Sequence, residues 1–240
     1  LWNVYLFGPL TIIKSLKKKK IFGVLVGFFA IVIIYGINSS KIVLFIPALV
    51  VGAYFLLKLK KNIFKYFLLG FSFLMLLLYK ISNYFFVLSA VILMRTFGIT
   101  GLLTYQYEKF FQNNPNTYYS HINFVNKFIY EYPYNEEDLG KVVSRYFISD
   151  SESNSNANFW ATDGFASLDE LGVIIISIIL GFFLLFWKKM INNSNYLELN
   201  LMLVPFSFII LNVGFFTSIL SGGYLFFLFY YFYNKKIKKI

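Results

Sequence analysis

The 240-residue chain has no cysteine, one histidine and few charged residues. Without cysteine, no disulfide, thiolate metal site or thiol nucleophile can form. The lone histidine, His121, excludes a histidine-rich metal cluster. Neither a G-x-x-x-x-G-K-[ST] motif nor a G-x-G-x-x-G motif after a strand occurs, which argues against an ATP-driven pump and a nucleotide-sugar enzyme. Only 14% of the residues are charged, where a soluble domain has about a quarter, so the composition argues against a soluble protein.

The chain is instead rich in long runs of apolar residues. Hydrophobic residues make up 58% of the chain, the mean hydropathy is +0.66, and the apolar residues form runs rather than amphipathic repeats. About 20 such residues in a helix cross the ~30 Å hydrocarbon core of a bilayer. The sequence therefore predicts an all-α polytopic membrane protein with a single membrane domain over residues 1–240. The six predicted membrane-spanning helices are Ile21–Ile37, Ile42–Leu57, Ile63–Tyr79, Leu171–Trp187, Leu199–Phe216 and Gly222–Tyr233.

The net charge of +11 indicates membrane orientation rather than nucleic-acid binding. Twenty of the 22 basic residues are lysines, and most of them flank apolar runs. Ten of the eleven acidic residues lie between Glu108 and Glu170. Placing the lysine-rich turns in the cytoplasm puts 15 of the 22 basic residues there and leaves the acidic segment outside. We therefore expect no nucleic-acid partner.

The acidic segment, Thr104–Glu170, is predicted to be a large extracytoplasmic loop that packs on the membrane domain, and we call it the lid. It contains ten acidic and four basic residues, and it is too long for a simple connector. Before it, the apolar segment Ile81–Leu103 is interrupted by Arg95. If that segment crossed the membrane, the lid would be cytoplasmic and two later lysine clusters would face outward. We therefore predict that Ile81–Leu103 is a re-entrant or interfacial helix.

Arg95 and Arg145 are the only arginines, and both lie on the predicted outer side. A charge beside an apolar segment is costly and usually functional, and a guanidinium binds phosphate or carboxylate through two parallel hydrogen bonds. The two arginines therefore either contact a phosphate group or form structural ion pairs with lid acids such as Glu108 or Asp163.

Two stretches of the lid contain further candidates. Because imidazole titrates close to neutral pH, His121 is a candidate general base, although a lone loop histidine is more often a hydrogen-bonding surface residue. The segment Asn156–Ala166 combines amides, Trp160 and Asp163, which favours a saccharide platform; helix caps and an interfacial tryptophan are the alternative. The other lid acids, including Glu136–Asp138, are expected to form a solvated surface without a chemical role.

Five stretches of the chain share the pattern of a known family: Arg95–Tyr107, Phe111–His121, Tyr132–Tyr134, Asn156–Ala166 and Leu171–Ile175. They resemble the Wzy-type polymerases that join oligosaccharide repeat units in bacterial O-antigen and capsule assembly. The resemblance is strongest over residues 85–185, and elsewhere it rests on the hydrophobic pattern alone. Such polymerases have more spans, so Leu1–Ile13 is expected to be the end of a helix in an N-terminally truncated chain. Ser167–Glu170 departs from the pattern, because a glycine-containing turn is expected there.

The resemblance implies a membrane-embedded glycosyltransferase of the GT-C-like kind in the bacterial cytoplasmic (inner) membrane. It implies a polyprenyl-pyrophosphate-linked glycan as donor, a lipid-linked repeat unit as acceptor, and a chain-length regulator protein as a further partner. Cations must then stabilise the leaving pyrophosphate, and a base must take the proton of the acceptor hydroxyl. No cofactor or metal is required if arginines neutralise the phosphates. The implied roles are catalytic base for His121 or Asp163, pyrophosphate binding for Arg95, Arg145 and Lys141, and sugar contact for Tyr118, Asn158 and Trp160.

Other classes of protein stay open. An O-antigen ligase uses similar parts and differs only in its acceptor. A transporter or flippase for lipid-linked glycans predicts internal repeats and charged or broken helices at the middle of the bilayer. The predicted spans lack central charges, apart from Lys65 near the start of one of them. In a non-catalytic membrane scaffold, Arg95 and Arg145 would be replaceable.

Overall fold

The structure is a computed structural model of the chain, and the residues that it describes form helices and connections without any strand. The predicted all-α fold class is thereby confirmed. The described residues are 2–38, 42–59, 63–82, 86–87, 90, 94, 98–135, 137–148, 154–155, 160–211 and 213–237.

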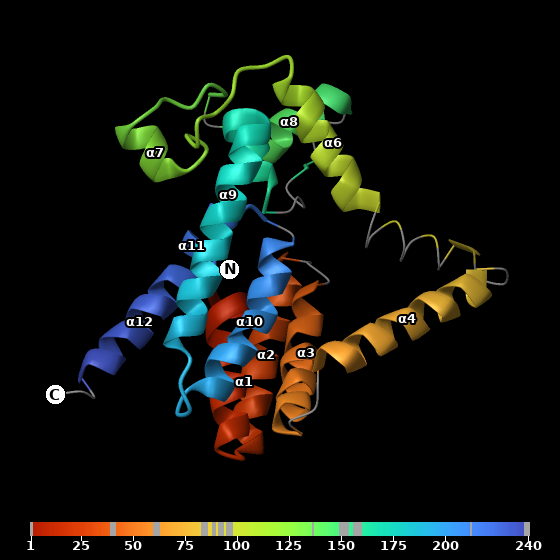
Figure 1. The fold of residues 1–240 in the computed structure, drawn as a ribbon. Coiled ribbons are helices and arrows are strands. Elements are labelled where there is room, and N and C mark those ends of the chain that lie inside the picture. Colours follow the sequence, from red (N-terminus) through yellow and green to blue (C-terminus); the bar gives the residue numbers. More distant parts are fainter. Residues whose placement is uncertain are drawn as a thin grey trace.

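A bundle of packed helices forms the larger part of the molecule (Figure 1). Its helices coincide with the apolar runs of the sequence, and α2 contains 18 residues without a single charge. α1 packs against α2 and α3, and α10 packs against α3. Side chains such as Ile12, Ile31, Val50 and Met202 are buried in one continuous core. The bundle comprises η1 (Asn3–Phe7, a π-helical turn), α1 (Gly8–Lys17), α2 (Ile21–Asn38), α3 (Ile42–Lys58), the later part of α9 (Thr162–Met190), α10 (Tyr196–Ile210), α11 (Phe215–Leu220) and α12 (Tyr224–Ile237).

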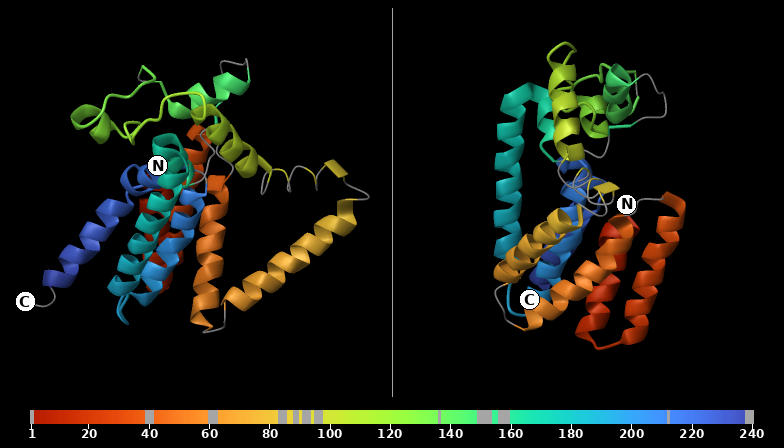
Figure 2. Two further views of the ribbon diagram at one scale, coloured as in Figure 1. Left: turned by 45° about the horizontal axis from the view of Figure 1, so that its top comes forward. Right: turned by 90° about the vertical axis from the view of Figure 1, so that its right-hand side faces the viewer.

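Large apolar side chains remain exposed around the bundle. α9 is long and apolar enough to cross a membrane, and only 17% of its most apolar stretch is buried. α4 (Ile63–Ser82) and α12 extend away from the other helices (Figures 1 and 2). They expose side chains such as Phe73 and Phe229. The core helix of a soluble protein would instead bury such residues.

The lid covers one end of the bundle, as Figures 1 and 2 show. Its described helices are α6 (Ile99–Phe111, which begins just before the lid), α7 (Asn123–Phe128), α8 (Leu139–Phe147) and the first part of α9. The lid has its own small core, which includes Phe110 and Val143 and is distinct from the core of the bundle. Because α6 packs on both α8 and α9, the lid is a folded unit that α9 connects to the bundle.

α9 consists of two helical parts joined by a sharp break. At the break Asp169 has a positive φ of 53°, a conformation that costs energy for any residue except glycine. The two parts meet so closely that the backbones of Gly164 and Gly172 touch, and a Cβ atom on either glycine would overlap the other's backbone. Asn116 Nδ2 donates a 2.9 Å hydrogen bond to the Asp169 carboxylate. The sequence has no glycine at Ser167–Glu170, where the family pattern predicts a glycine-containing turn. The chain nevertheless turns there, with Asp169 in the strained conformation.

Helices occupy the six ranges that the sequence predicts as spans, with one correction. The single helix predicted over Leu199–Phe216 is wrong, because α10 ends at Ile210 and α11 begins at Phe215. The chain turns at Gly214, where the Asp163 side chain leaves no room for a Cβ atom. A side chain that is distant in the sequence thus packs against the break.

About half of the range Ile81–Leu103, where the re-entrant helix is predicted, lies outside the described residues, and Arg95 is among the residues left out. α6 begins inside this range, at Ile99. Most of the Ser- and Asn-rich stretch 149–159 also lies outside the described residues.

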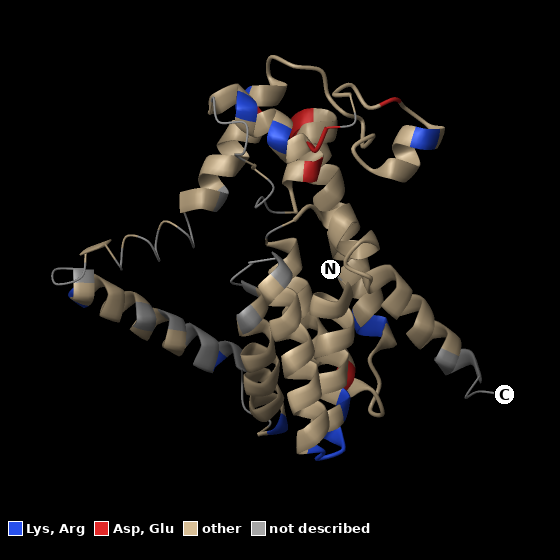
Figure 3. Ribbon diagram, turned by 180° about the vertical axis from the view of Figure 1, so that it is seen from behind, with Lys and Arg blue, Asp and Glu red and all other residues tan. Residues whose placement is uncertain are grey.

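Charge is distributed unevenly between the two ends of the molecule (Figure 3). Lysines gather at the turn between α1 and α2, at the end of the bundle away from the lid. Every described acidic residue except Glu198 lies in the lid. The apolar bundle therefore separates a basic end from an end rich in acids.

Candidate active site between the lid and the bundle

A polar cavity of about 580 Å³ lies between the lid and the bundle. Small-molecule sites typically have volumes of about 300–1,000 Å³. Lid residues form most of the wall, and the turn between α10 and α11 together with Thr217 of α11 completes it. The lining residues are Tyr107, Ser120, His121, Asn123, Asn126, Tyr132, Glu137, Asp138, Leu139 and Asp163 from the lid, and Val213, Gly214 and Thr217 from the bundle.

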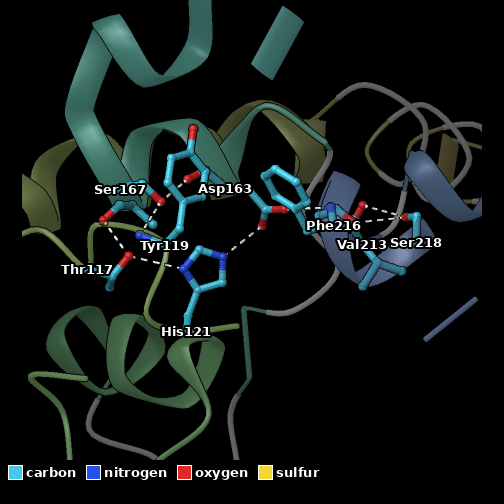
Figure 4. Close-up of polar contacts among 10 residues, drawn as sticks. Thr117, Tyr119, His121, Asp163, Ser167, Val213, Phe216 and Ser218 are labelled. Atoms are coloured by element: carbon cyan, nitrogen blue, oxygen red, sulfur yellow. Dashed lines mark hydrogen bonds and ion pairs between the residues drawn. The ribbon is translucent and has the colours of Figure 1, made fainter. Parts of the chain in front are cut away.

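His121 and Asp163 meet in this cavity (Figure 4). His121 Nε2 lies 3.5 Å from Asp163 Oδ1, which is longer than a good hydrogen bond but within the range of an ion pair. The two side chains are only 10% and 8% exposed. From the sequence these residues are alternative bases, whereas in the structure they form one pair.

The Asp163 carboxylate is fixed between α9 and α11. Asp163 belongs to the first turn of α9, and its Oδ2 accepts a 3.1 Å hydrogen bond from the backbone N–H of Phe216. It therefore caps α11 from outside that helix. Gly214, just before α11, packs directly against the carboxylate. Oδ2 is thus hydrogen-bonded to the bundle, and Oδ1 faces His121.

A short turn of the lid positions His121. Tyr118 and Tyr119 in this turn have positive φ angles of 47° and 64°, which are uncommon for bulky residues. Two hydrogen bonds to the first part of α9 hold the turn. The N–H of Thr117 donates to a carbonyl of α9 at 2.7 Å, and the N–H of Tyr119 donates to Ser167 Oγ at 3.2 Å (Figure 4). Such backbone strain is concentrated at functional sites in proteins.

The hydroxyl of Thr117 lies between a backbone carbonyl group and Nδ1 of His121, where it can favour one tautomer of the ring. Thr117 Oγ lies 2.9 Å from the carbonyl oxygen of Ala166 and 3.0 Å from His121 Nδ1. A carbonyl oxygen only accepts, so when the hydroxyl proton points to Ala166, the Nδ1–H of His121 donates to Thr117. In the neutral imidazole Nε2 is then unprotonated and can take a proton from a hydroxyl in the cavity. Because Asp163 would stabilise the resulting imidazolium, the pair can perform general acid–base chemistry.

Thr117→Val should change the tautomer of His121. Because His121 is the only histidine, ¹⁵N labelling of histidine gives a single pair of ring signals in the NMR spectrum. In the neutral wild-type ring we expect the proton on Nδ1. Thr117→Val removes its acceptor and should populate the Nε2–H form, which can donate to Asp163, whereas Thr117→Ser should match the wild type. A wild-type spectrum dominated by Nε2–H would refute this role of Thr117.

Arg145 forms an ion pair instead of lining the cavity. Its Nη2 lies 3.0 Å from Glu137 Oε2, so the partner is Glu137 and not Glu108 or Asp163. Both side chains are nearly half exposed, at 47% and 45%. Glu137 itself lines the cavity, which places Arg145 beside the cavity wall.

Three other predicted contact residues are not part of the cavity lining. Lys141 and Tyr118 are exposed, and Trp160 packs against the core of the bundle. The two remaining predicted residues, Arg95 and Asn158, lie outside the described residues.

The sequence did not identify one wall of the cavity, formed by residues of the lid. Asn126 and Tyr132 line it, and Tyr132 belongs to one of the stretches that resemble the polymerases. The interpretation of Glu136–Asp138 as a solvated surface needs a correction. Glu137 and Asp138 are exposed, as expected, but they also line the cavity. The spacing of charged residues in a loop does not show which of them will line a cavity.

The fold and the site together define an all-α protein with a histidine–carboxylate pair in a polar cavity beneath a lid. The described residues contain no group of three or more His, Asp or Glu side chains that could hold a metal ion. Comparisons with protein-family models, with curated proteins and with solved structures found no match for this chain.

Proposed function

We propose that the protein is a membrane-embedded glycosyltransferase that joins polyprenyl-pyrophosphate-linked oligosaccharide repeat units at the outer face of the bacterial cytoplasmic membrane. The observation that supports it most strongly is the buried His121–Asp163 pair in a polar cavity beside an apolar bundle. Such a cavity suits a hydroxyl-rich substrate that is attached to a lipid. The stretches that resemble Wzy-type polymerases include both residues.

A multi-spanning membrane domain is part of this proposal. Besides α9, the bundle contains shorter apolar helices, and exposed side chains such as Phe29, Ile33 and Phe182 lie on its outside. Soluble monomers rarely expose large contiguous apolar patches. Lipid would cover this surface, with the lysine-rich end in the cytoplasm and the lid outside. In that orientation the cavity opens at the outer side of the membrane.

In the proposed reaction, a hydroxyl of the acceptor sugar enters the cavity beside His121. Its oxygen attacks the anomeric carbon of the donor glycan, and the bond between that carbon and the pyrophosphate oxygen breaks. The hydroxyl proton passes to His121 Nε2, and Asp163 stabilises the imidazolium. The proton then leaves to the pyrophosphate or to water. The products are polyprenyl pyrophosphate and a longer lipid-linked glycan.

Cationic groups must stabilise the leaving pyrophosphate as negative charge builds on it. Lys141 and Arg145 belong to α8, and Glu137 and Asp138 just before this helix line the cavity. Pyrophosphate would replace Glu137 as the partner of Arg145, and exposed ion pairs of this kind contribute only about 0–1 kcal/mol. Arg95 is proposed as a second pyrophosphate ligand from the sequence pattern alone.

Deleting the gene in its host tests the proposal. We expect the length ladder of the surface polysaccharide to collapse to one repeat unit, with single lipid-linked units accumulating in the membrane. Long glycans that accumulate on the polyprenyl lipid without being transferred would instead identify a ligase. An unchanged ladder would contradict both activities.

A further inference from the structure

One wall of the cavity has no role in the acid–base chemistry described above. It is contributed by a single region of the lid, from the start of α7 to the residue just before α8, and it lines the same cavity as His121 and Asp163. Its side chains are amides, a phenol and carboxylates, all of which form hydrogen bonds. The residues of this wall are Asn123, Asn126, Tyr132, Glu137 and Asp138.

The hydroxyl of Tyr132 is buried and has no hydrogen-bond partner among the described residues. Burial raises the pKa of this phenol well above its ordinary value, and the nearby Tyr134, Asp138 and Glu137 raise it further, so the hydroxyl keeps its proton. Asn126 Oδ1 accepts a 2.9 Å hydrogen bond from the Tyr132 N–H and fixes the backbone there. A buried hydroxyl without a partner is costly, and a ligand or water usually completes its bonding.

His121 Nε2 is the second buried polar atom in this cavity without a hydrogen bond in the described structure. Its distance of 3.5 Å from Asp163 Oδ1 is longer than that of a good hydrogen bond. Nε2 accepts in the neutral ring, and the Tyr132 hydroxyl donates. A ligand with several hydroxyl groups can satisfy both, because each hydroxyl both donates and accepts.

The charge of the cavity restricts that ligand further. Its described lining contains the carboxylates of Glu137, Asp138 and Asp163 but neither lysine nor arginine. A carboxylate, sulfate or phosphate on the bound sugar would meet like charges at close range, whereas the donor's pyrophosphate is proposed to bind outside this lining, at Arg145 and Lys141. Hydroxyl and ammonium groups would instead donate hydrogen bonds to these carboxylates.

We propose that this wall binds the terminal sugar of the acceptor glycan, and that this sugar is neutral or carries an amino group. The inference rests on the proposed function, because the attacking hydroxyl must lie beside the His121–Asp163 pair. Tyr132 donates to one hydroxyl of the sugar, and Asp138 accepts from another. These contacts orient the acceptor for attack, so they determine both its affinity and its position.

Tyr132→Phe and Tyr134→Phe test the wall as a matched pair, since each removes one phenolic oxygen from the same stretch. The Tyr134 hydroxyl donates to the carbonyl of Pro115 inside the lid, whereas the Tyr132 hydroxyl has no partner among the described residues. In a deletion strain that expresses each variant, Tyr132→Phe should slow chain extension roughly threefold to tenfold without lowering the melting temperature. Tyr134→Phe should lower the melting temperature and leave chain extension normal at permissive temperature. Normal extension by Tyr132→Phe would overturn the assignment.

Asp138→Asn provides a second test. Because Asp138 is exposed, the substitution does not disturb the core of the lid. It should also slow chain extension while leaving the melting temperature unchanged, and normal extension would again overturn the proposal.

The terminal sugar can be identified directly in the single repeat units that accumulate in the deletion strain. Mass spectrometry and methylation analysis should find a neutral or amino sugar at the non-reducing end. A uronic acid or a sulfated or phosphorylated sugar there would overturn this inference but not the proposed polymerase. Failure of single units to accumulate would contradict the polymerase itself.

Discussion

Chain extension should fall at least about a hundredfold when Asp163 is replaced by asparagine or His121 by glutamine, because general acid–base catalysis contributes roughly 10²–10⁴ in rate. Asp163→Asn keeps an oxygen that can accept the Phe216 N–H, so α11 stays capped. It removes the charge that stabilises the imidazolium. His121→Gln keeps a polar side chain that cannot take up the proton. The measurement is the rate of polysaccharide lengthening in the complemented deletion strain, normalised to the amount of protein in the membrane.

Asp169→Asn is the matched control for Asp163→Asn, because it makes the same chemical change in the same helix. Asp169 lies at the break of α9, accepts a hydrogen bond from Asn116 and does not line the cavity. Asparagine also tolerates a positive φ angle better than most residues. This variant should extend chains normally. The acid–base pair would be refuted if both asparagine variants behaved alike, or if His121→Gln extended chains at the wild-type rate.

Gly172→Ala should be among the most destabilising single substitutions in the chain. A Cβ atom at Gly172 would overlap the backbone of Gly164, and backbone atoms cannot move aside as a flexible side chain can. Overpacking of this kind costs about 1–3 kcal/mol, and we expect a value at the upper end. For a chain of this length that lowers the melting temperature by roughly 6–12 °C. The measurement is thermal unfolding of the purified protein in detergent.

Gly181→Ala is the control in the same helix, since a Cβ atom there meets no atom within 4 Å. It should leave the melting temperature unchanged or raise it slightly, because alanine is favoured over glycine in helices by about 0.5–1 kcal/mol. If Gly172→Ala were as stable as Gly181→Ala, the close contact between the two parts of α9 would be contradicted.

The helices could be predicted because apolar runs of a given length are a local property of the sequence. The predicted spans Ile21–Ile37 and Ile42–Leu57 coincide closely with α2 and α3. The break between α10 and α11 could not be predicted. Asp163, from another helix, packs against Gly214 at this break and accepts a hydrogen bond from the Phe216 N–H. Such a contact has no signature in the run Leu199–Phe216 itself.

The chemical identity of the site could be predicted better than its geometry. His121 and Asp163 stand out because they are unusual residues for their surroundings, but nothing in the sequence shows that they meet. Their pairing depends on the turn at Thr117 and on the sharp break in α9, and both are tertiary features. In the sequence Tyr132 stands out only because it belongs to a stretch that resembles the Wzy-type polymerases. The burial of its hydroxyl follows from the folding of the lid.

The most direct measurement of the central claim is reconstitution of the reaction. The purified protein in liposomes would be mixed with single lipid-linked repeat units extracted from the deletion strain. We predict that wild-type protein forms glycans of two or more units and releases one polyprenyl pyrophosphate for each new linkage, and that Asp163→Asn forms almost none. If the wild type formed no product longer than one unit, or if Asp163→Asn formed it equally fast, the proposed polymerase and its acid–base pair would be contradicted.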